Sequence, residues 1–404
     1  MKNGRSLLIR ILWLGLIVAG ANSCAPQTTA IPAMLPTLII ESTPPLTTAF
    51  ASGESSIILY RGDSQRTGVY NVPAIRQQPA TKWQIKISST WLMPPILADG
   101  MLYTGSGDGT LYALNAETGE QVWSVGGFGQ LEMTGAIADD SIIAGGYSKL
   151  VKALNRKTGD ELWTYTTEHV IQGSPLIIDK RVYIATDHTV YALDLESGQL
   201  IWKVPTGTED AFMGAPAYDD GVIYTTGGKL LLALDAQTGK EIWRVKKDEI
   251  FLGLAVANQL VYVGNWDQNF YAFDQSTGEE RWSFKGGNIF WSAPAVDGNT
   301  VYAGNIDKHL YSLNAQTGEL RWSFQSAGDA VSEPLVADGV VYVSDSSHET
   351  RSGPRHLYAL DATTGEQLWV FETTSTFLPA PALGENILYV TTTGEIIALK
   401  PSGK

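Results

Sequence analysis

The feature that most limits the fold of this chain is a phrase of the form Thr/Ser-Gly-x-x-x-Trp that occurs seven times. Its tryptophans are Trp123, Trp163, Trp202, Trp243, Trp282, Trp322 and Trp369, and Trp83 marks the same register one period earlier. The eight tryptophans are spaced 40, 40, 39, 41, 39, 40 and 47 residues apart. A period near 40 residues is typical of β-propellers and solenoids. Each period therefore predicts one repeated structural unit.

The residues between the tryptophans indicate strands. Apolar side chains alternate with polar ones, as in VYIATDHTVYALD from Val182 to Asp194, and Asp, Asn and Gly separate such stretches. Alternation with a period of two predicts half-buried strands joined by tight turns. Four such strands fit each period, which excludes helical arrays and predicts one propeller blade per unit.

The two ends of the repeat array predict how the ring closes. The last unit has only three strands, around PAPAL, ILYVT and EIIALK, while the Trp83 strand has no unit of its own. We therefore predict an all-β, eight-bladed β-propeller of four-stranded antiparallel blades, in which the N-terminal Trp83 strand completes the last blade. Closure of this kind removes exposed sheet edges. The eight repeat tryptophans are predicted to fill the gaps between blades and to be structural.

The phrase AxxTGxxxW resembles the repeat of the pyrroloquinoline quinone (PQQ) type of β-propeller, and the stretch LYRGDSQRTGVYN from Leu59 is similar to that family's lead-in segment. The resemblance covers residues 59–404. It implies a quinone-dependent dehydrogenase, with calcium and an Asp base in a central funnel, or a propeller without a cofactor. The family's dehydrogenases often carry an adjacent cysteine pair, whereas this chain has one cysteine and no CxxCH haem motif. We therefore expect no cofactor and no catalytic residues.

Charge and residue spacing argue against several other functions. The chain has 28 Lys and Arg against 42 Asp and Glu, a net charge of −14, which disfavours binding to the phosphates of nucleic acids. The five histidines form no HxH or HExxH pattern, so we expect no metal site. No GxSxG phrase is present, so nucleophilic hydrolysis has no support.

The first 56 residues predict an export signal followed by a tether. Residues 1–24 combine basic residues, an apolar run from Ile11 to Ala21 and small residues before Cys24, a layout typical of a secretory signal. It also resembles a bacterial lipobox, which implies a lipid anchor on Cys24; cleavage and secretion without a lipid is the alternative. Residues 25–56 are rich in Pro and Thr, which predicts a flexible tether spanning on the order of 30 Å. Residues 57–404 then form the propeller, held outside the cytoplasm on an envelope membrane.

The loops that lead from each Trp strand to the next unit carry aromatic and methionine side chains at equivalent positions. Met and aromatic residues anchor many protein interfaces. We predict a partner-binding face made by these loops, one hairpin tip and the enlarged seventh hairpin, with the residues Trp91, Met93, Met133, Phe212, Met213, Phe251, Trp266, Phe290, Trp291, Phe377, Arg351 and Arg355. The alternative is that the aromatic side chains form a core layer that plugs the central channel.

An export signal, a lipid anchor, a tether and a bare propeller resemble the lipoproteins of this family, which implies a scaffold in outer-membrane assembly. We therefore predict a monomeric, non-catalytic scaffold that binds an envelope or membrane protein through one face and binds no nucleic acid. In a source with a single membrane, this prediction reduces to an envelope-anchored binding scaffold. Two alternatives stay open, namely a PQQ- and calcium-dependent dehydrogenase and an extracytoplasmic ligand-binding or sensor module.

Overall fold

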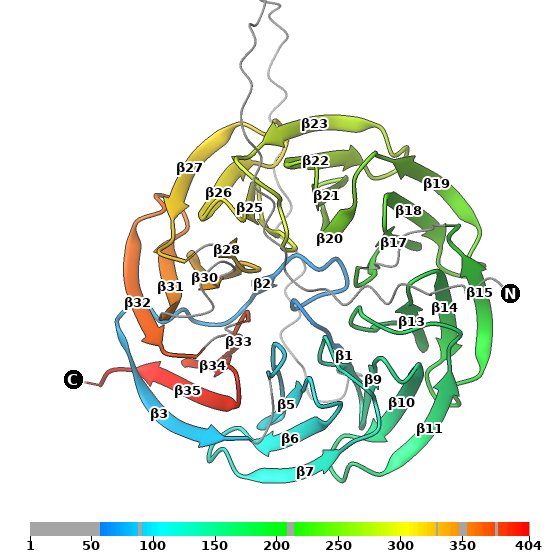
Figure 1. The fold of residues 1–404 in the computed structure, drawn as a ribbon, viewed down its shortest axis with the longest axis horizontal. Coiled ribbons are helices and arrows are strands. Elements are labelled where there is room, and N and C mark those ends of the chain that lie inside the picture. Colours follow the sequence, from blue (N-terminus) through cyan, green and yellow to red (C-terminus); the bar gives the residue numbers. More distant parts are fainter. Residues whose placement is uncertain are drawn as a thin grey trace, which may run out of the picture. The chain divides into compact units, whose positions relative to one another are not determined.

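The computed structural model describes residues 57–87, 91–207, 214–328, 330–346, 354–375 and 379–403. In these residues all regular secondary structure is β-strand, and the strands form eight sheets arranged as blades around a central axis (Figure 1). This confirms the predicted eight-bladed β-propeller. Within the same ranges no helix is long and apolar enough to span a membrane. The predicted signal, Cys24 and the tether lie outside the described residues.

Each blade is an antiparallel sheet whose strands follow one another in the chain from the axis outward. Blade 1 contains β4 (Ile96–Ala98), β5 (Met101–Gly105), β6 (Leu111–Asn115) and β7 (Gln121–Val125), and blade 2 contains β8 (Ala136–Ala138), β9 (Ser141–Gly145), β10 (Leu150–Asn155) and β11 (Glu161–Thr166). Blade 3 contains β12 (Leu176–Ile178), β13 (Arg181–Ala185), β14 (Thr189–Asp194) and β15 (Leu200–Pro205), and blade 4 contains β16 (Ala217–Asp219), β17 (Val222–Gly227), β18 (Leu230–Asp235) and β19 (Glu241–Lys246). Blade 5 contains β20 (Phe251–Ala257), β21 (Leu260–Asn265), β22 (Asn269–Asp274) and β23 (Glu280–Lys285), and blade 6 contains β24 (Ala295–Asp297), β25 (Thr300–Gly304), β26 (His309–Asn314) and β27 (Leu320–Gln325). Blade 7 contains β29 (Leu335–Ala337), β30 (Val340–Ser346), β31 (Arg355–Asp361) and β32 (Gln367–Thr373), with the short β28 (Ala330–Val331) paired to β30.

Blade 8 joins the two ends of the repeat array, as predicted. Its first three strands are β33 (Ala382–Gly384), β34 (Ile387–Thr391) and β35 (Glu395–Pro401). Its outermost strand is β3 (Pro79–Lys86), which pairs with β35 from Pro79 opposite Pro401 to Lys86 opposite Glu395. The ring is therefore closed by hydrogen bonds between segments from opposite ends of the propeller sequence.

The repeat tryptophans lie between neighbouring blades, and each indole is held in the same way. All eight indole N–H groups donate to a backbone carbonyl of the next blade or, for Trp369, to Ile75 in the segment that leads into β3, at 2.7 to 3.2 Å. Trp123, Trp163, Trp243, Trp282 and Trp369 are at most 9% exposed, and the other three are partly exposed. The prediction that these residues fill the gaps between blades is therefore confirmed by their positions.

The glycine of the repeated phrase receives the tryptophan of the preceding blade. Gly318, for example, has φ +73, and a Cβ added there would lie 2.6 Å from the ring of Trp282. In seven blades a tyrosine of the second strand donates to the same carbonyl as the indole of its own blade, as Tyr262 and Trp282 both do to Ala315. The phrase thus encodes a contact between blades as well as a turn within one blade.

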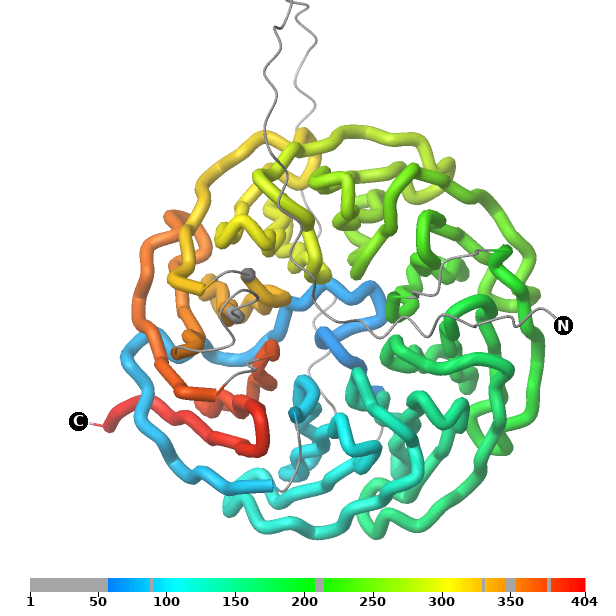
Figure 2. Tube along the Cα trace, viewed as in Figure 1, coloured from blue at the N-terminus to red at the C-terminus, as the bar shows by residue number. Residues whose placement is uncertain are grey.

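A segment before the first blade runs through the centre of the ring. Residues 57–70, called the central plug below, include β1 (Ile57–Ile58), which pairs antiparallel with β8, and β2 (Val69–Tyr70), which pairs parallel with β29. Between these strands the carbonyls of Ser64, Gln65, Thr67 and Gly68 accept backbone N–H groups from blades 4, 5, 6 and 7. The blue trace of this segment crosses the middle of the ring in Figures 1 and 2. The sequence had predicted only a lead-in segment here, without a position.

Candidate protein-binding face

The propeller has two faces, which differ in the connections that they carry. We call loop face the side with the loops from the fourth strand of one blade to the first strand of the next, together with the turns between second and third strands. We call turn face the opposite side, with the turns between first and second strands and between third and fourth strands. Those predicted partner-binding residues that the structure describes belong to loop-face connections or to strand ends beside them.

The structure separates the predicted partner-binding set into buried and exposed residues. Phe251 and Phe290 are 0% exposed and Met93 is 4% exposed. Phe290 packs among the rings of Phe270, Phe284 and Tyr311, with centroid separations of 5.5 to 6.2 Å. These predicted contact residues are therefore corrected to members of the core, as in the alternative interpretation, because blade packing encloses them.

Other members of the set keep access to solvent. Trp91, Met133 and Trp291 are partly exposed, and Trp266 is 37% exposed. Four further predicted residues, namely Phe212, Met213, Phe377 and Arg351, lie outside the described residues. Among the described residues of the set, Trp266 in blade 5 is the most exposed aromatic side chain, and Trp291 lies in the loop between blades 5 and 6.

Trp266 and Trp291 form a stacked pair on the loop face. Their ring centroids are 6.1 Å apart with an interplanar angle of 27°. The pair joins the turn between β21 and β22 to the loop between β23 and β24. The backbone N–H of Trp266 donates to the carbonyl of Ile250 at 3.0 Å, which fixes the turn beside the preceding loop, where Asp248 and Glu249 are exposed. The two stacked indoles therefore form an aromatic surface next to the carboxylates of Asp248 and Glu249.

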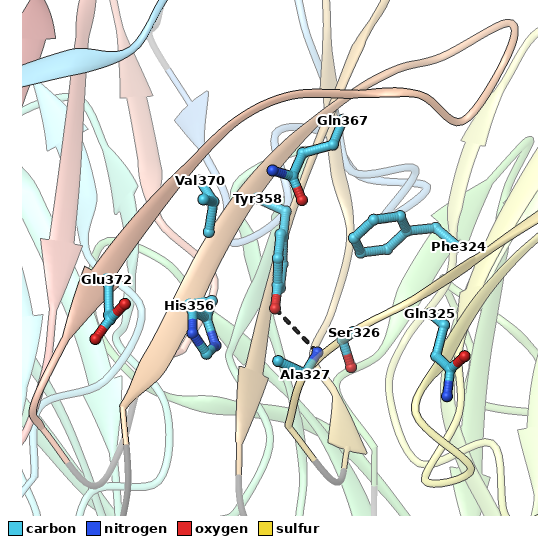
Figure 3. A pocket seen from close by; sticks show the side chains of 9 residues that line it. All are labelled: Phe324, Gln325, Ser326, Ala327, His356, Tyr358, Gln367, Val370 and Glu372. Atoms are coloured by element: carbon cyan, nitrogen blue, oxygen red, sulfur yellow. Dashed lines mark hydrogen bonds between the residues drawn. The ribbon is translucent and has the colours of Figure 1, made fainter.

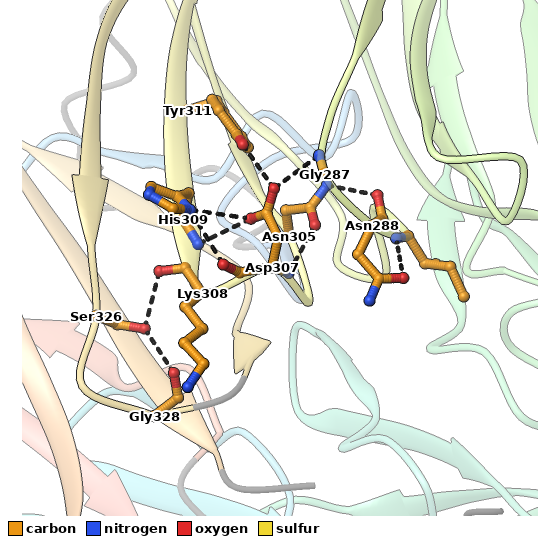
Figure 4. A network of polar contacts seen from close by, with 10 residues as sticks. Gly287, Asn288, Asn305, Asp307, Lys308, His309, Tyr311, Ser326 and Gly328 are labelled. Carbon is orange, nitrogen blue, oxygen red and sulfur yellow. Dashed lines mark hydrogen bonds and ion pairs between the residues drawn. The ribbon is translucent and has the colours of Figure 1, made fainter. Parts of the chain in front are cut away.

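Aspartates at three loop-face turns accept hydrogen bonds from their own hairpins. In the sequences DGTLY, DQNFY and DKHLY the aspartate accepts the backbone N–H two residues on and the tyrosine hydroxyl four residues on. Asp307 accepts from the backbone of His309 at 3.0 Å, from the hydroxyl of Tyr311 at 2.6 Å and from the N–H of Gly287 at 2.8 Å (Figure 4). Burial, and then the bond to Asp307, raise the pKa of Tyr311. The sequence analysis missed this Asp-x-x-x-Tyr repeat, although its spacing is visible in the sequence.

The seventh hairpin retains these contacts in spite of its additional residues. Asp345 is 0% exposed and accepts from Gly328 N–H, from His356 N–H and Nδ1, each at 2.8 Å, and from the Tyr358 hydroxyl at 3.0 Å. The extra residues therefore lie between Asp345 and His356. Arg355, predicted as a contact cation of this hairpin, is only 1% exposed, so the prediction of an exposed contact is wrong for this side chain.

An open groove of about 420 Å³ lies beside this hairpin, between the outer strands of blades 6 and 7 (Figure 3). Phe324, His356, Tyr358 and Glu372 contribute to its lining, and the Tyr358 hydroxyl accepts the N–H of Ala327 at 3.0 Å. A second hollow of about 460 Å³ lies on the turn face between blades 4 and 5. In the described part of the chain no group of three or more His, Cys, Asp or Glu side chains is arranged to hold a metal ion.

Two buried arginines of the central plug occupy the channel. Arg61 and Arg66 are each 1% exposed, and burial lowers the pKa of Arg61 to about 10 and that of Arg66 to about 9. Arg66 donates to the carbonyls of Tyr60, Ser174, Pro175 and Pro216 at 2.6 to 3.3 Å. Pro175 directly precedes the first strand of blade 3, and Pro216 directly precedes the first strand of blade 4. The plug therefore binds the start of several blades at once.

One carboxylate lies beside the plug arginines. Glu333 Oε2 is 3.8 Å from Arg61 Nη1, and the Glu333 side chain is 27% exposed. Burial raises the pKa of Glu333 to about 7, although an N–H from Ala293 acts in the opposite direction. The channel thus contains a titratable group next to a fixed cation.

Eight closed blades with a shared Trp phrase define a repeat β-propeller of the PQQ-like type. More specifically, a family model described as outer membrane protein assembly factor BamB matches residues 77–185, 128–211, 186–289 and 286–404, and the chain belongs to this family. No curated protein sequence matches the chain significantly.

Solved structures with the same fold include a BamB protein, a designed protein and an alcohol dehydrogenase. BamB from Moraxella catarrhalis is 20% identical, with a TM-score of 0.65 over 80% of this chain and 100% of that one. The computationally designed Ika8 protein is 17% identical, with a TM-score of 0.68 over 78% and 98% of the two chains. The quinohemoprotein alcohol dehydrogenase ADHIIG from Pseudomonas putida HK5 is 14% identical, with a TM-score of 0.71 over 86% and 80%. At these identities the structures establish the shared fold and nothing about activity.

Proposed function

We propose that this protein is a non-catalytic scaffold, held at the cell envelope by a lipid on Cys24, that binds a protein partner through its loop face. The main support is the stacked pair of Trp266 and Trp291. Large aromatic side chains that stay exposed on a rigid turn are typical of interface anchors. Membership of the BamB family gives independent support, because that family is described as an assembly factor of outer-membrane proteins.

The central plug favours a scaffold over a quinone-dependent dehydrogenase. Arg61 and Arg66 are buried in the channel and donate to carbonyls at the start of several blades. A cofactor at this level of the channel would have to displace these side chains. Displacement of the two arginine side chains would leave buried carbonyls without hydrogen-bond donors, which would destabilise the folded protein.

The function is tested by crosslinking and affinity recovery of the tagged, membrane-anchored protein from its own cells. A variant with Trp266→Ala and Trp291→Ala removes the exposed stack and leaves the buried Phe290 in place. Leu162→Ala is the matched control, because Leu162 is an apolar side chain that is 54% exposed on the outer wall of blade 2. We expect one dominant envelope protein with the wild type and with the control, and at least a tenfold lower recovery with the double variant.

Three results would argue against this proposal. Equal recovery with the double variant would place the interface elsewhere on the propeller. Saturable binding of PQQ in the presence of calcium, with reduction of an artificial electron acceptor by an alcohol substrate, would favour a dehydrogenase. Protection of the Trp266 surface by a small molecule and not by a protein would favour a ligand-binding or sensor module.

A further inference from the structure

At two blade boundaries, the space between the outer strands holds a lysine of this chain. Between blades 4 and 5, Lys247 Nζ lies 4.3 Å from the ring centroid of Tyr271 and 2.7 Å from Glu280 Oε2. Between blades 2 and 3, the ammonium group of Lys203 pairs with Glu168. An ammonium group is attracted both by the face of an aromatic ring and by a carboxylate. The chain therefore fills each of these spaces with a cation of its own.

The groove between blades 6 and 7 has the aromatic rings and the carboxylate but no such cation. The rings of Phe324 and Tyr358 pack edge to face there, with centroids 5.0 Å apart. The exposed side chain of Glu372 lines the same groove, on the other side of Tyr358 from Phe324 (Figure 3). None of the residues that line the groove is Lys or Arg, and no ion pair joins Glu372 to another residue in the described ranges.

The two positions that carry lysines elsewhere are occupied by shorter side chains in this groove. Val370 takes the place of Lys203, because each directly follows the repeat tryptophan of its blade. Ser326 takes the place of Lys247, because each lies four residues after that tryptophan. Both Val370 and Ser326 line the groove of about 420 Å³. The space that a lysine fills at the other two boundaries is therefore open at this one.

We propose that the groove between blades 6 and 7 binds a lysine side chain of the protein partner, with its ammonium group beside Glu372 and its methylene groups against Phe324 and Tyr358. The inference rests on the proposed function only in assigning this lysine to the partner. The occupants of the equivalent spaces are lysines, which favours an ammonium group over a guanidinium group. The net charge of −14 favours the approach of a cationic segment.

The position of the groove fits a partner that binds the loop face. Ser326 and Ala327 line the groove and begin the connection that follows β27, which is a loop-face connection. Trp291 lies in the corresponding connection one blade earlier, between β23 and β24. A partner that covers the stacked pair of Trp266 and Trp291 would therefore meet the groove at the next blade boundary.

Binding is measured on the full-length protein in detergent by saturation-transfer difference NMR. The probe is a tripeptide with lysine between two glycines and both ends blocked, and the same peptide with norleucine in place of lysine is the uncharged comparison. We expect saturable transfer to the ε-methylene of lysine, and binding of the norleucine peptide at least about fivefold weaker.

Variants locate the site of the probe. Glu372→Gln should weaken binding of the lysine peptide at least about fivefold, and Val370→Lys should abolish it because the new lysine fills the groove. Glu366→Gln is the matched control, since Glu366 is an exposed carboxylate on the turn face of the same blade, and it should bind the peptide as the wild type does. Equal binding of the two peptides, or equal binding to Glu372→Gln and the wild type, would overturn the inference. Choline that binds more tightly than the lysine peptide would also overturn it, in favour of a lipid headgroup.

The assignment of the lysine to the partner is tested by recovery of the tagged protein from its own cells. Val370→Lys should lower recovery of the dominant envelope protein at least about fivefold, and Glu366→Gln should not. Equal recovery with Val370→Lys and the wild type would overturn this assignment. If the wild type binds the lysine peptide but recovers no partner, the proposed function is refuted, whereas the ammonium site itself is confirmed.

Discussion

Replacement of Arg66 by methionine tests whether the central plug stabilises the ring. Methionine fills a similar volume but has no donor, so the carbonyls of Tyr60, Ser174, Pro175 and Pro216 would lose their guanidinium partner. A buried acceptor without a donor costs about 1 kcal/mol or more, so four of them cost about 4 kcal/mol. Loss of the buried charge offsets part of this, because burial disfavours the charged guanidinium.

We therefore expect Arg66→Met to lower the free energy of unfolding by about 3 kcal/mol. The assay is urea denaturation followed by intrinsic tryptophan fluorescence at pH 7, with Arg76→Met as the control. Arg76 also donates to a carbonyl, but its side chain is 48% exposed, so water can replace it there. A change in Arg66→Met of less than 1 kcal/mol, or one no larger than in the control, would show that the plug arginine only fills space.

Three other changes have expected outcomes that can be measured in the same way. Gly318→Ala should destabilise the protein by at least about 2 kcal/mol more than Gly221→Ala. Both glycines have positive φ, but only a Cβ at position 318 would collide with an indole ring. Similar urea midpoints for the two variants would contradict this. Glu333 has a raised pKa in the folded chain, so its contribution to stability is present below pH 4.5 and is lost as the pH rises through about 7. As the pH rises from 5 to 8, the free energy of unfolding of the wild type should therefore fall by about 2 kcal/mol more than that of Glu333→Gln. Parallel pH profiles of the two proteins would refute this. Phe290→Ala should cost about 3 to 5 kcal/mol because the ring is fully buried, whereas Trp291→Ala should shift the thermal midpoint far less.

The fold could be predicted from the sequence because its main contacts repeat. The spacing of the tryptophans gave the number of blades, and the unpaired Trp83 strand gave the closure with β35. The phrase contains both partners of the contact between blades, so its period is also the period of the structure. In contrast, Arg61 and Arg66 occur once in a polar stretch, and no repeat or hydrophobic pattern indicates that they are buried.

The candidate face could be predicted only in outline. Loop-face positions followed from the order of strands, but burial at each position depends on how deeply a loop enters the gap between blades. Phe290 and Trp291 are neighbours in sequence, yet the first is in the core and the second is partly exposed. The seventh hairpin illustrates the same limit, because Arg355 lies in an apparent surface loop and is buried at the start of β31.

The central plug also bears on how many blades this ring can have. Contacts between a tryptophan and the glycine of the next blade are the same at nearly every boundary, so they would be satisfied equally well if a blade were duplicated or lost. The plug differs, because β1 pairs with blade 2 and β2 pairs with blade 7 across a fixed number of residues. The length of the plug therefore matches the distance between blades 2 and 7 in an eight-bladed ring. A gain or loss of one blade in evolution would require the plug to change length or to be lost.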